Sequence, residues 1–155
     1  MARAFKDERV IPPAAPYRFW MTPELEPLQA KIDAKETLSK DEIITYTRLR
    51  GKEDLFFFGR RCFGFDWLEA PLHTDLAYAW QVMSGTNHNG RIYGNVRMAL
   101  LARGSLKTTL LTQAYSAWRL VRDQEERGLI FSYSYAFAVK ILSVIKSRFE
   151  GHVPH

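Results

Sequence analysis

The chain has 155 residues, of which 46% are hydrophobic and 14% aromatic, and its formal net charge is +5. This composition indicates one globular domain with enough apolar material for a core, and the single cysteine, Cys62, excludes a disulfide framework and a thiolate metal cluster. The positive charge permits contact with a polyanion such as DNA, and an ordinary basic surface accounts for it equally well.

Residues 1–20 contain Pro12, Pro13 and Pro16 among charged and small residues, which predicts an extended arm. No apolar run approaches the ~20 residues that a membrane span needs, and no apolar signal core follows the charged start. We therefore expect a cytoplasmic protein that does not contact a membrane, with Cys62 buried and unreactive.

Residues 21–95 are predicted to be a helical segment. Thr22 and Pro23 have the order of a cap and a first-turn proline, which predicts a short helix that runs to Ile32. Ser39 and Glu42 have the spacing of a capping box at the start of a second helix.

Two further helices are predicted in this segment. Apolar residues between Gly51 and Gly64 indicate a helix over residues 52–62. Apolar residues at helical spacing up to Met83 indicate another, which opens at Thr74 or at the residue before it.

The stretch over residues 96–111 carries the main functional signal. An apolar run of strand length over residues 96–102 breaks at Arg103-Gly104-Ser105, and apolar residues at helical spacing resume after Lys107. A strand, a tight loop and a helix start bring backbone N–H groups and the positive end of a helix dipole together, and Lys107 adds a full charge. The pattern therefore predicts a phosphate-binding loop, in which Gly104 supplies a positive φ.

The general P-loop pattern is not matched, because leucine stands at both glycine positions, Leu101 and Leu106. The general pattern alone therefore allows two interpretations of these residues, a phosphate site or a basic turn at the start of an ordinary helix.

The rest of the chain predicts a second strand and a second helix. Residues 129–133 form a short apolar run, and residues 135–149 have helical spacing. With the preceding stretch, residues 96–155 are predicted to form an incomplete β-α-β-α unit whose right-handed crossover places the phosphate at the carboxyl end of the first strand. The predicted fold class is α/β, a partial P-loop NTPase of parallel strands with flanking helices, preceded by a helical segment.

The sequence Arg103-Gly104-Ser105-Leu106-Lys107-Thr108-Thr109 resembles the deviant P-loop of the large terminase subunit of tailed bacteriophages. That loop typically has arginine, glycine, two variable residues, lysine and two hydroxyl residues. The flanking segments resemble the corresponding parts of the same ATPase domain, residues 54–60 and 67–76 before the loop and residues 128–134 and 138–149 after it. The likeness thus spans about residues 40–150. The resemblance implies a motor that hydrolyses ATP to package DNA into a capsid.

The resemblance also implies roles for the loop residues. Lys107 would bind the β- and γ-phosphates of ATP, Thr108 would ligate Mg²⁺, and Arg103 would stabilise the γ-phosphate. Arg103 can instead pair with a nearby carboxylate. Gly104 and Ser105 would contribute backbone groups, and the side chain of Leu106 must point away from the phosphates. Thr109 is either a second hydroxyl near the phosphates or a plain first-turn residue.

The adenine base would lie against the segment before the loop. Phe65, Trp67 and His73 are the candidates, although each of these residue types is more often a packing residue than a base contact. His73 can equally be a helix-capping neighbour of Thr74.

The acids that hydrolysis needs are missing. No acidic residue after Thr109 follows an apolar strand, so neither the magnesium-binding aspartate, the catalytic glutamate nor the acids of a nuclease is present. We therefore interpret the chain as the truncated front part of a terminase large subunit, with weak ATP binding and negligible turnover. For the full-length protein we expect a homo-oligomeric ring with double-stranded DNA, the portal protein and the small terminase subunit as partners. The alternative is a non-enzymatic basic helical module that binds nucleic acid or a phage partner, with a vestigial phosphate loop.

Overall fold

The structure, a computed structural model, describes residues 21–83 and 99–151. The helices in these ranges, with η marking the wider π-helical turns, are α1 (Glu26–Asp33), α2 (Lys40–Glu53), α3 (Leu55–Phe57), η2 (Phe58–Cys62), α4 (Leu72–Met83), η3 (Thr108–Ala114), α5 (Tyr115–Arg122) and α6 (Tyr135–Phe149). No β-strand occurs in the described residues.

The predicted α/β fold class, with its parallel strands, is therefore wrong. Residues 99–102 are irregular, and residues 96–98 of the first predicted strand lie outside the described ranges. The second predicted strand, residues 129–133, is irregular as well, with Phe131 89% exposed. A strand needs a neighbour to accept its backbone hydrogen bonds, and the described residues supply none. Within residues 129–133, only Ile130 packs against the main core. This contact attaches the segment to the helices, and no sheet is involved.

The helix predictions are largely confirmed. The capping box of Ser39 and Glu42 and the last helix are present. The short first helix is present too, but it begins at Glu26 with no side-chain cap, and not after the cap expected at Thr22. The helix expected over residues 52–62 is divided, because α2 ends at Glu53 and Asp54 starts α3 by accepting the N–H of Phe57 at 2.9 Å. Helix α4 begins at Leu72, before the predicted start at Thr74.

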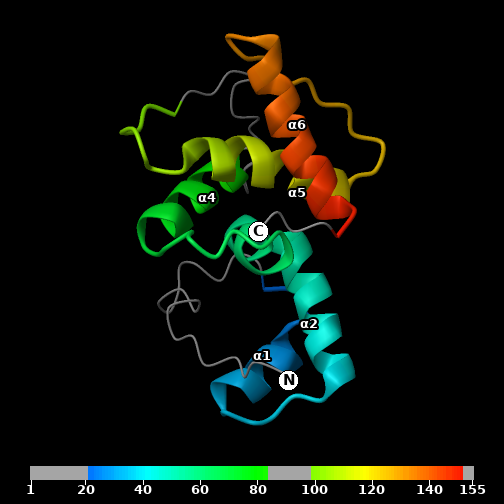
Figure 1. The fold of residues 1–155 in the computed structure, drawn as a ribbon. Helices are drawn as coiled ribbons and strands as arrows, with labels where there is room; N and C mark the ends of the chain where they lie inside the picture. Colours follow the sequence, from blue (N-terminus) through cyan, green and yellow to red (C-terminus); the bar gives the residue numbers. More distant parts are fainter. Residues whose placement is uncertain (1–20, 84–98, 152–155) are drawn as a thin grey trace.

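The helices form two packed groups that share α2 (Figure 1). Helix α1 and the first turns of α2 lie at one end of the molecule, around a small cluster of Leu25, Tyr46 and Phe57. Helices α4, α5 and α6 lie at the other end. Their main core consists of Leu55, Phe56, Phe58, Phe63, Phe65, Leu68, Ala77, Leu110, Ala114, Ala117, Trp118, Ile141 and Ile145.

A chain of buried hydrogen bonds joins the two groups. The Tyr46 hydroxyl donates to Gln29 of α1 at 2.7 Å and accepts from Arg50 at 2.6 Å. Arg50 also pairs with Asp54 at 3.2 Å, and both of these side chains are almost fully buried. Because buried charges are costly unless they are paired, this network fixes the junction of α2 and α3.

Two contacts place the later helices on this junction. The indole N–H of Trp118 in α5 donates to the carbonyl of Gly51 at 3.1 Å. In α4, the Gln81 side chain accepts the N–H of Leu55 at 3.0 Å and donates to the carbonyl of Glu53. Backbone N–H and C=O groups at the junction of α2 and α3 therefore have hydrogen-bond partners in side chains of α4 and α5.

Gly59 lies where η2 packs tightly against η3. A Cβ at this position would lie 3.3 Å from the Cβ of Ala114 and 3.1 Å from Leu68 Cδ1. The Ala114 methyl group is fixed to a helix backbone and cannot rotate away. The absence of a side chain at Gly59 therefore sets the spacing of these two helices.

Among the described residues, no helix combines the length and the apolarity needed to cross a bilayer.

We predict that Gly59→Ala lowers the free energy of unfolding by about 1–3 kcal/mol, because the added methyl group overpacks the contact between η2 and η3. Gly128→Ala is the matched control, since nothing lies within 4 Å of its Cβ position, and we expect no loss of stability there. Urea unfolding measures both values. Equal midpoints for the two variants would contradict the packing argument.

Candidate functional site

The candidate site is the loop over residues 102–109. The chain enters it through irregular residues, turns at residues 103–105 and continues into the helix formed by η3 and α5. Gly104 has φ +88° and Leu106 has φ +52°. Gly104 thus has the positive φ that the sequence predicted for it, whereas the left-handed conformation of Leu106 could not be expected from its residue type.

The backbone changes hand at the end of the loop. Lys107 has right-handed helical angles, φ −56° and ψ −40°, directly after the positive φ of Leu106. Such an alternation turns successive N–H groups to one side and creates a concave site for an anion. The next N–H groups belong to the first helical turn, where they have no partner within the helix. The local geometry is therefore suited to bind a phosphate.

The ammonium group of Lys107 is turned back over the entrance of the loop. Its Nζ lies 3.2 Å from the carbonyl oxygen of Leu101 and 3.1 Å from that of Ala102. These partners are neutral, and within the described residues no carboxylate pairs with this ammonium. Its full positive charge is therefore not compensated by a carboxylate of the described residues and lies at the entrance of the loop.

Ser105 closes the loop on itself. Its hydroxyl donates to the carbonyl of Ala102 at 2.8 Å, and its backbone N–H lies 3.4 Å from the same oxygen. Leu106 is packed against the main core, so its side chain is directed away from the polar face of the loop. Together these contacts hold the loop in shape without a strand before it.

The remaining loop residues are available to a ligand. Arg103 is exposed, and in the described part of the chain neither a hydrogen bond nor an ion pair involves its guanidinium group. Thr108 and Thr109 lie in the first turn of η3 and are partly exposed. The structure thus brings Arg103, Lys107 and both threonines to one end of one helix.

The acidic residues after the loop do not reach it through any described contact. Glu126 pairs with Arg119 at 2.6 Å, and Glu150 pairs with Lys146 at 3.7 Å. No group of three or more histidine, cysteine or acidic side chains is arranged for a metal ion in residues 21–83 and 99–151. The sequence prediction itself assigns a magnesium contact to Thr108 alone.

The three adenine candidates have different surroundings. Phe65 is 2% exposed and belongs to the main core, whereas Trp67 is half exposed and its ring centroid lies 5.5 Å from that of Phe65. His73 is buried, and its Nε2 lies 3.3 Å from the carbonyl oxygen of Ser105. No local sequence pattern predicts this contact, because the two residues are 32 positions apart.

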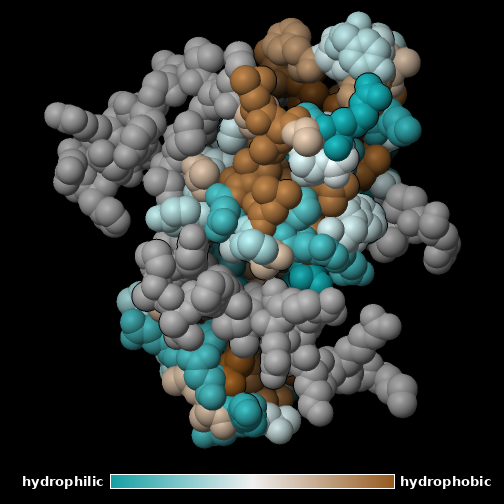
Figure 2. Space-filling view, turned by 90° about the vertical axis from the view of Figure 1, so that its left-hand side faces the viewer, coloured by the Kyte–Doolittle hydropathy of each residue, from teal (hydrophilic) through white to brown (hydrophobic). Residues whose placement is uncertain are grey.

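Several large apolar side chains are exposed on the surface of the molecule. Figure 2 shows apolar surface on the half of the molecule that holds α4, α5 and α6. The most exposed large apolar and aromatic residues are Leu100, Leu129, Phe131, Tyr133 and Tyr135.

No protein-family model, no curated protein and no solved structure matches the chain.

Cys62 does not contribute to this site. The residue is exposed rather than buried, which corrects the expectation from sequence, and its Sγ lies 4.0 Å from the carbonyl of Thr47. Although the residue as a whole is exposed, its Sγ atom lies against α2, beside Thr47 and Gly51, and this local desolvation raises the pKa of the Cys62 thiol to about 11. Little thiolate is present at neutral pH, so Cys62 is neither a nucleophile nor a metal ligand there.

We predict that alkylation of Cys62 by iodoacetamide is slow at pH 7.5 and accelerates with a midpoint near its pKa of about 11. The thiol becomes reactive only as it ionises, and unfolding in urea should return the midpoint to about 8.5. Mass spectrometry of the alkylated chain over a pH series measures both midpoints. A folded-state midpoint equal to that of the unfolded chain would show that the fold does not suppress thiolate formation.

Proposed function

We propose that the chain binds the triphosphate of ATP through residues 102–109, as the ATP-binding front part of a phage terminase large subunit. The observation that carries the proposal is the Lys107 ammonium, held over the loop by two neutral carbonyl oxygens at the start of a helix. The parallel sheet expected from sequence is not part of the proposal. The phosphate contacts it invokes are all local to the loop.

The electrostatics of the loop favour an anionic ligand. A phosphate oxygen would replace neutral carbonyls as the partner of Lys107, and charge-assisted hydrogen bonds are about twice as strong as neutral ones. No acidic partner in the described residues has to be displaced first. The helix N-terminus adds partial positive charge at the same point.

The resemblance assigns the remaining roles. Arg103 is exposed beside the loop, where its planar cationic group can reach a γ-phosphate. Thr108 follows the lysine, which is the position of the hydroxyl that ligates Mg²⁺ in sites of this kind. The Mg²⁺ ion would neutralise phosphate charge, and Thr108 would orient it from the protein side.

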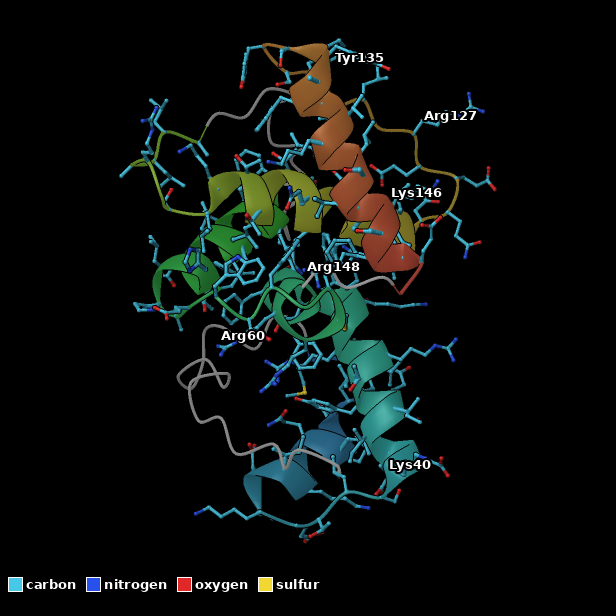
Figure 3. The ribbon with its side chains drawn as sticks, viewed as in Figure 1. Lys40, Arg60, Arg127, Tyr135, Lys146 and Arg148 are labelled. Carbon is cyan, nitrogen blue, oxygen red and sulfur yellow. The ribbon has the colours of Figure 1, made fainter. Side chains whose placement is uncertain are left out.

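The alternative, a basic module that binds nucleic acid through its surface, has less support. Figure 3 labels Lys40 at one end of the molecule, Arg60 near the middle and Arg127 at the other end. These three cations are spread over the length of the molecule and do not gather at one point. A single basic stripe is the usual electrostatic footprint of a nucleic-acid interface.

As part of a packaging motor, the chain would act in the host cell cytoplasm. Its partners would be double-stranded DNA, the portal protein and the small terminase subunit, in a homo-oligomeric ring. The described residues hold no magnesium-binding acid cluster, so we expect ATP binding with negligible turnover from this chain.

We predict that ATP with Mg²⁺ raises the unfolding temperature of the chain and that Lys107→Ala abolishes the increase. At a ligand concentration of 100 Kd the stabilisation is about 2.7 kcal/mol, which a thermal-shift assay detects. Lys140→Ala, an exposed lysine on α6, is the control and should keep the full shift. If Lys107→Ala retained the full shift, the proposed phosphate site would be wrong.

We predict that Arg103→Ala weakens ATP binding about tenfold and leaves ADP binding nearly unchanged, because only ATP has the γ-phosphate that the guanidinium would contact. Arg127→Ala, exposed in the turn after α5, is the matched control and should change neither affinity. Isothermal titration with both nucleotides gives the four ratios. An equal loss of affinity for ATP and ADP would show that Arg103 does not contact the γ-phosphate.

A further inference from the structure

His73 is a buried polar residue that links helix α4 to the candidate phosphate loop. It lies in the first turn of α4 and is 7% exposed. Its Nδ1 lies 2.8 Å from the backbone nitrogen of Glu69, and its Nε2 lies 3.3 Å from the carbonyl oxygen of Ser105. One side of the ring thus contacts the segment before α4, and the other side contacts the loop.

The contacts assign the proton positions of the ring. The N–H of Glu69 can only donate, so Nδ1 has to accept. The carbonyl oxygen of Glu69 also lies 2.9 Å from Nδ1. A hydrogen on Nδ1 directed to that oxygen would leave the N–H of Glu69 without its acceptor and Nε2 unable to donate to Ser105. In the neutral ring the hydrogen is then on Nε2, which donates to the oxygen of Ser105. This tautomer satisfies both ring nitrogens.

The Ser105 carbonyl is the point at which the rest of the fold holds the loop by a polar contact. The loop's own hydrogen bonds, from Ser105 and Lys107, all end on the carbonyls of Leu101 and Ala102. The bond from His73 instead comes from α4, and it draws the Ser105 carbonyl to the α4 side. It thereby limits rotation of the peptide that precedes Leu106, whose positive φ starts the change of hand at the phosphate-binding N–H groups.

We propose that His73 is a positioning residue for the phosphate loop, acting through the Ser105 carbonyl and not through contact with the nucleotide base. The proposal rests on the proposed function, because it describes how the phosphate-binding conformation is held before ATP arrives. Preorganisation of this kind raises affinity by reducing the ordering that binding requires.

Two conservative variants separate the two contacts of the ring. In His73→Asn, the side-chain oxygen can take the place of Nδ1 and keep the Glu69 bond, but the side chain is too short to reach Ser105. In His73→Gln, the amide nitrogen takes the place of Nε2 and can donate to Ser105. A residue that only caps the start of α4 would be replaced better by asparagine, and a residue that positions the loop would be replaced better by glutamine.

The first measurement needs no nucleotide. Hydrogen exchange of a peptide over residues 103–110 should be about tenfold faster in His73→Asn than in the wild-type chain, and close to wild type in His73→Gln. Equal exchange of this peptide in wild type and His73→Asn would overturn the positioning role, whatever the chain binds. A peptide from α2 is the control for general loss of stability.

The second measurement is the affinity for ATP with Mg²⁺. We expect about a tenfold loss in His73→Asn and at least partial rescue in His73→Gln, with ATP, ADP and inorganic triphosphate affected in the same ratio. A loss confined to ATP and ADP would assign His73 to the base and overturn the proposal. If the wild-type chain binds none of the three, the proposed function fails, while the exchange result still decides whether His73 holds the loop.

Discussion

The close contact between η2 and η3 is the constraint on which the candidate site depends. Gly59 lets the two helical segments pack closely, because any side chain at this position would meet Ala114 and Leu110. Because η3 continues without a break from the loop, fixing this helix also fixes where its first turn lies. The phosphate loop is thus placed by helix packing, where the sequence had predicted that a strand would place it.

The loop itself is shaped by local polar contacts. Its entry carbonyls, on Leu101 and Ala102, are satisfied by the Lys107 ammonium and the Ser105 hydroxyl. Buried or partly buried backbone groups need such partners, and an irregular segment has no ladder to supply them. The lysine that would bind phosphate therefore also stabilises the loop in the absence of a ligand.

The helices and the loop residues could be predicted from sequence because their signals are local. A serine and a glutamate three positions apart define the start of α2, and a glycine defines one positive φ of the loop. The strands could not be predicted reliably, since an apolar run is compatible with a strand only where a pairing neighbour exists. The contact of His73 with Ser105 depends on how α4 packs, and no pattern along the chain encodes it.

Phosphate binding by such a loop would require the Lys107 ammonium to exchange hydrogen-bond partners, because it already donates to two carbonyl oxygens. On binding of the proposed ligand, the ammonium would give up two carbonyl oxygens and gain phosphate oxygens, so the net gain would be the difference between neutral and charge-assisted hydrogen bonds. Releasing the carbonyls also removes two of the contacts that hold the entry of the loop. In the proposed role of His73, its contact with the Ser105 carbonyl would still tie the loop to α4 and would keep the N–H groups aligned while the lysine changes partners.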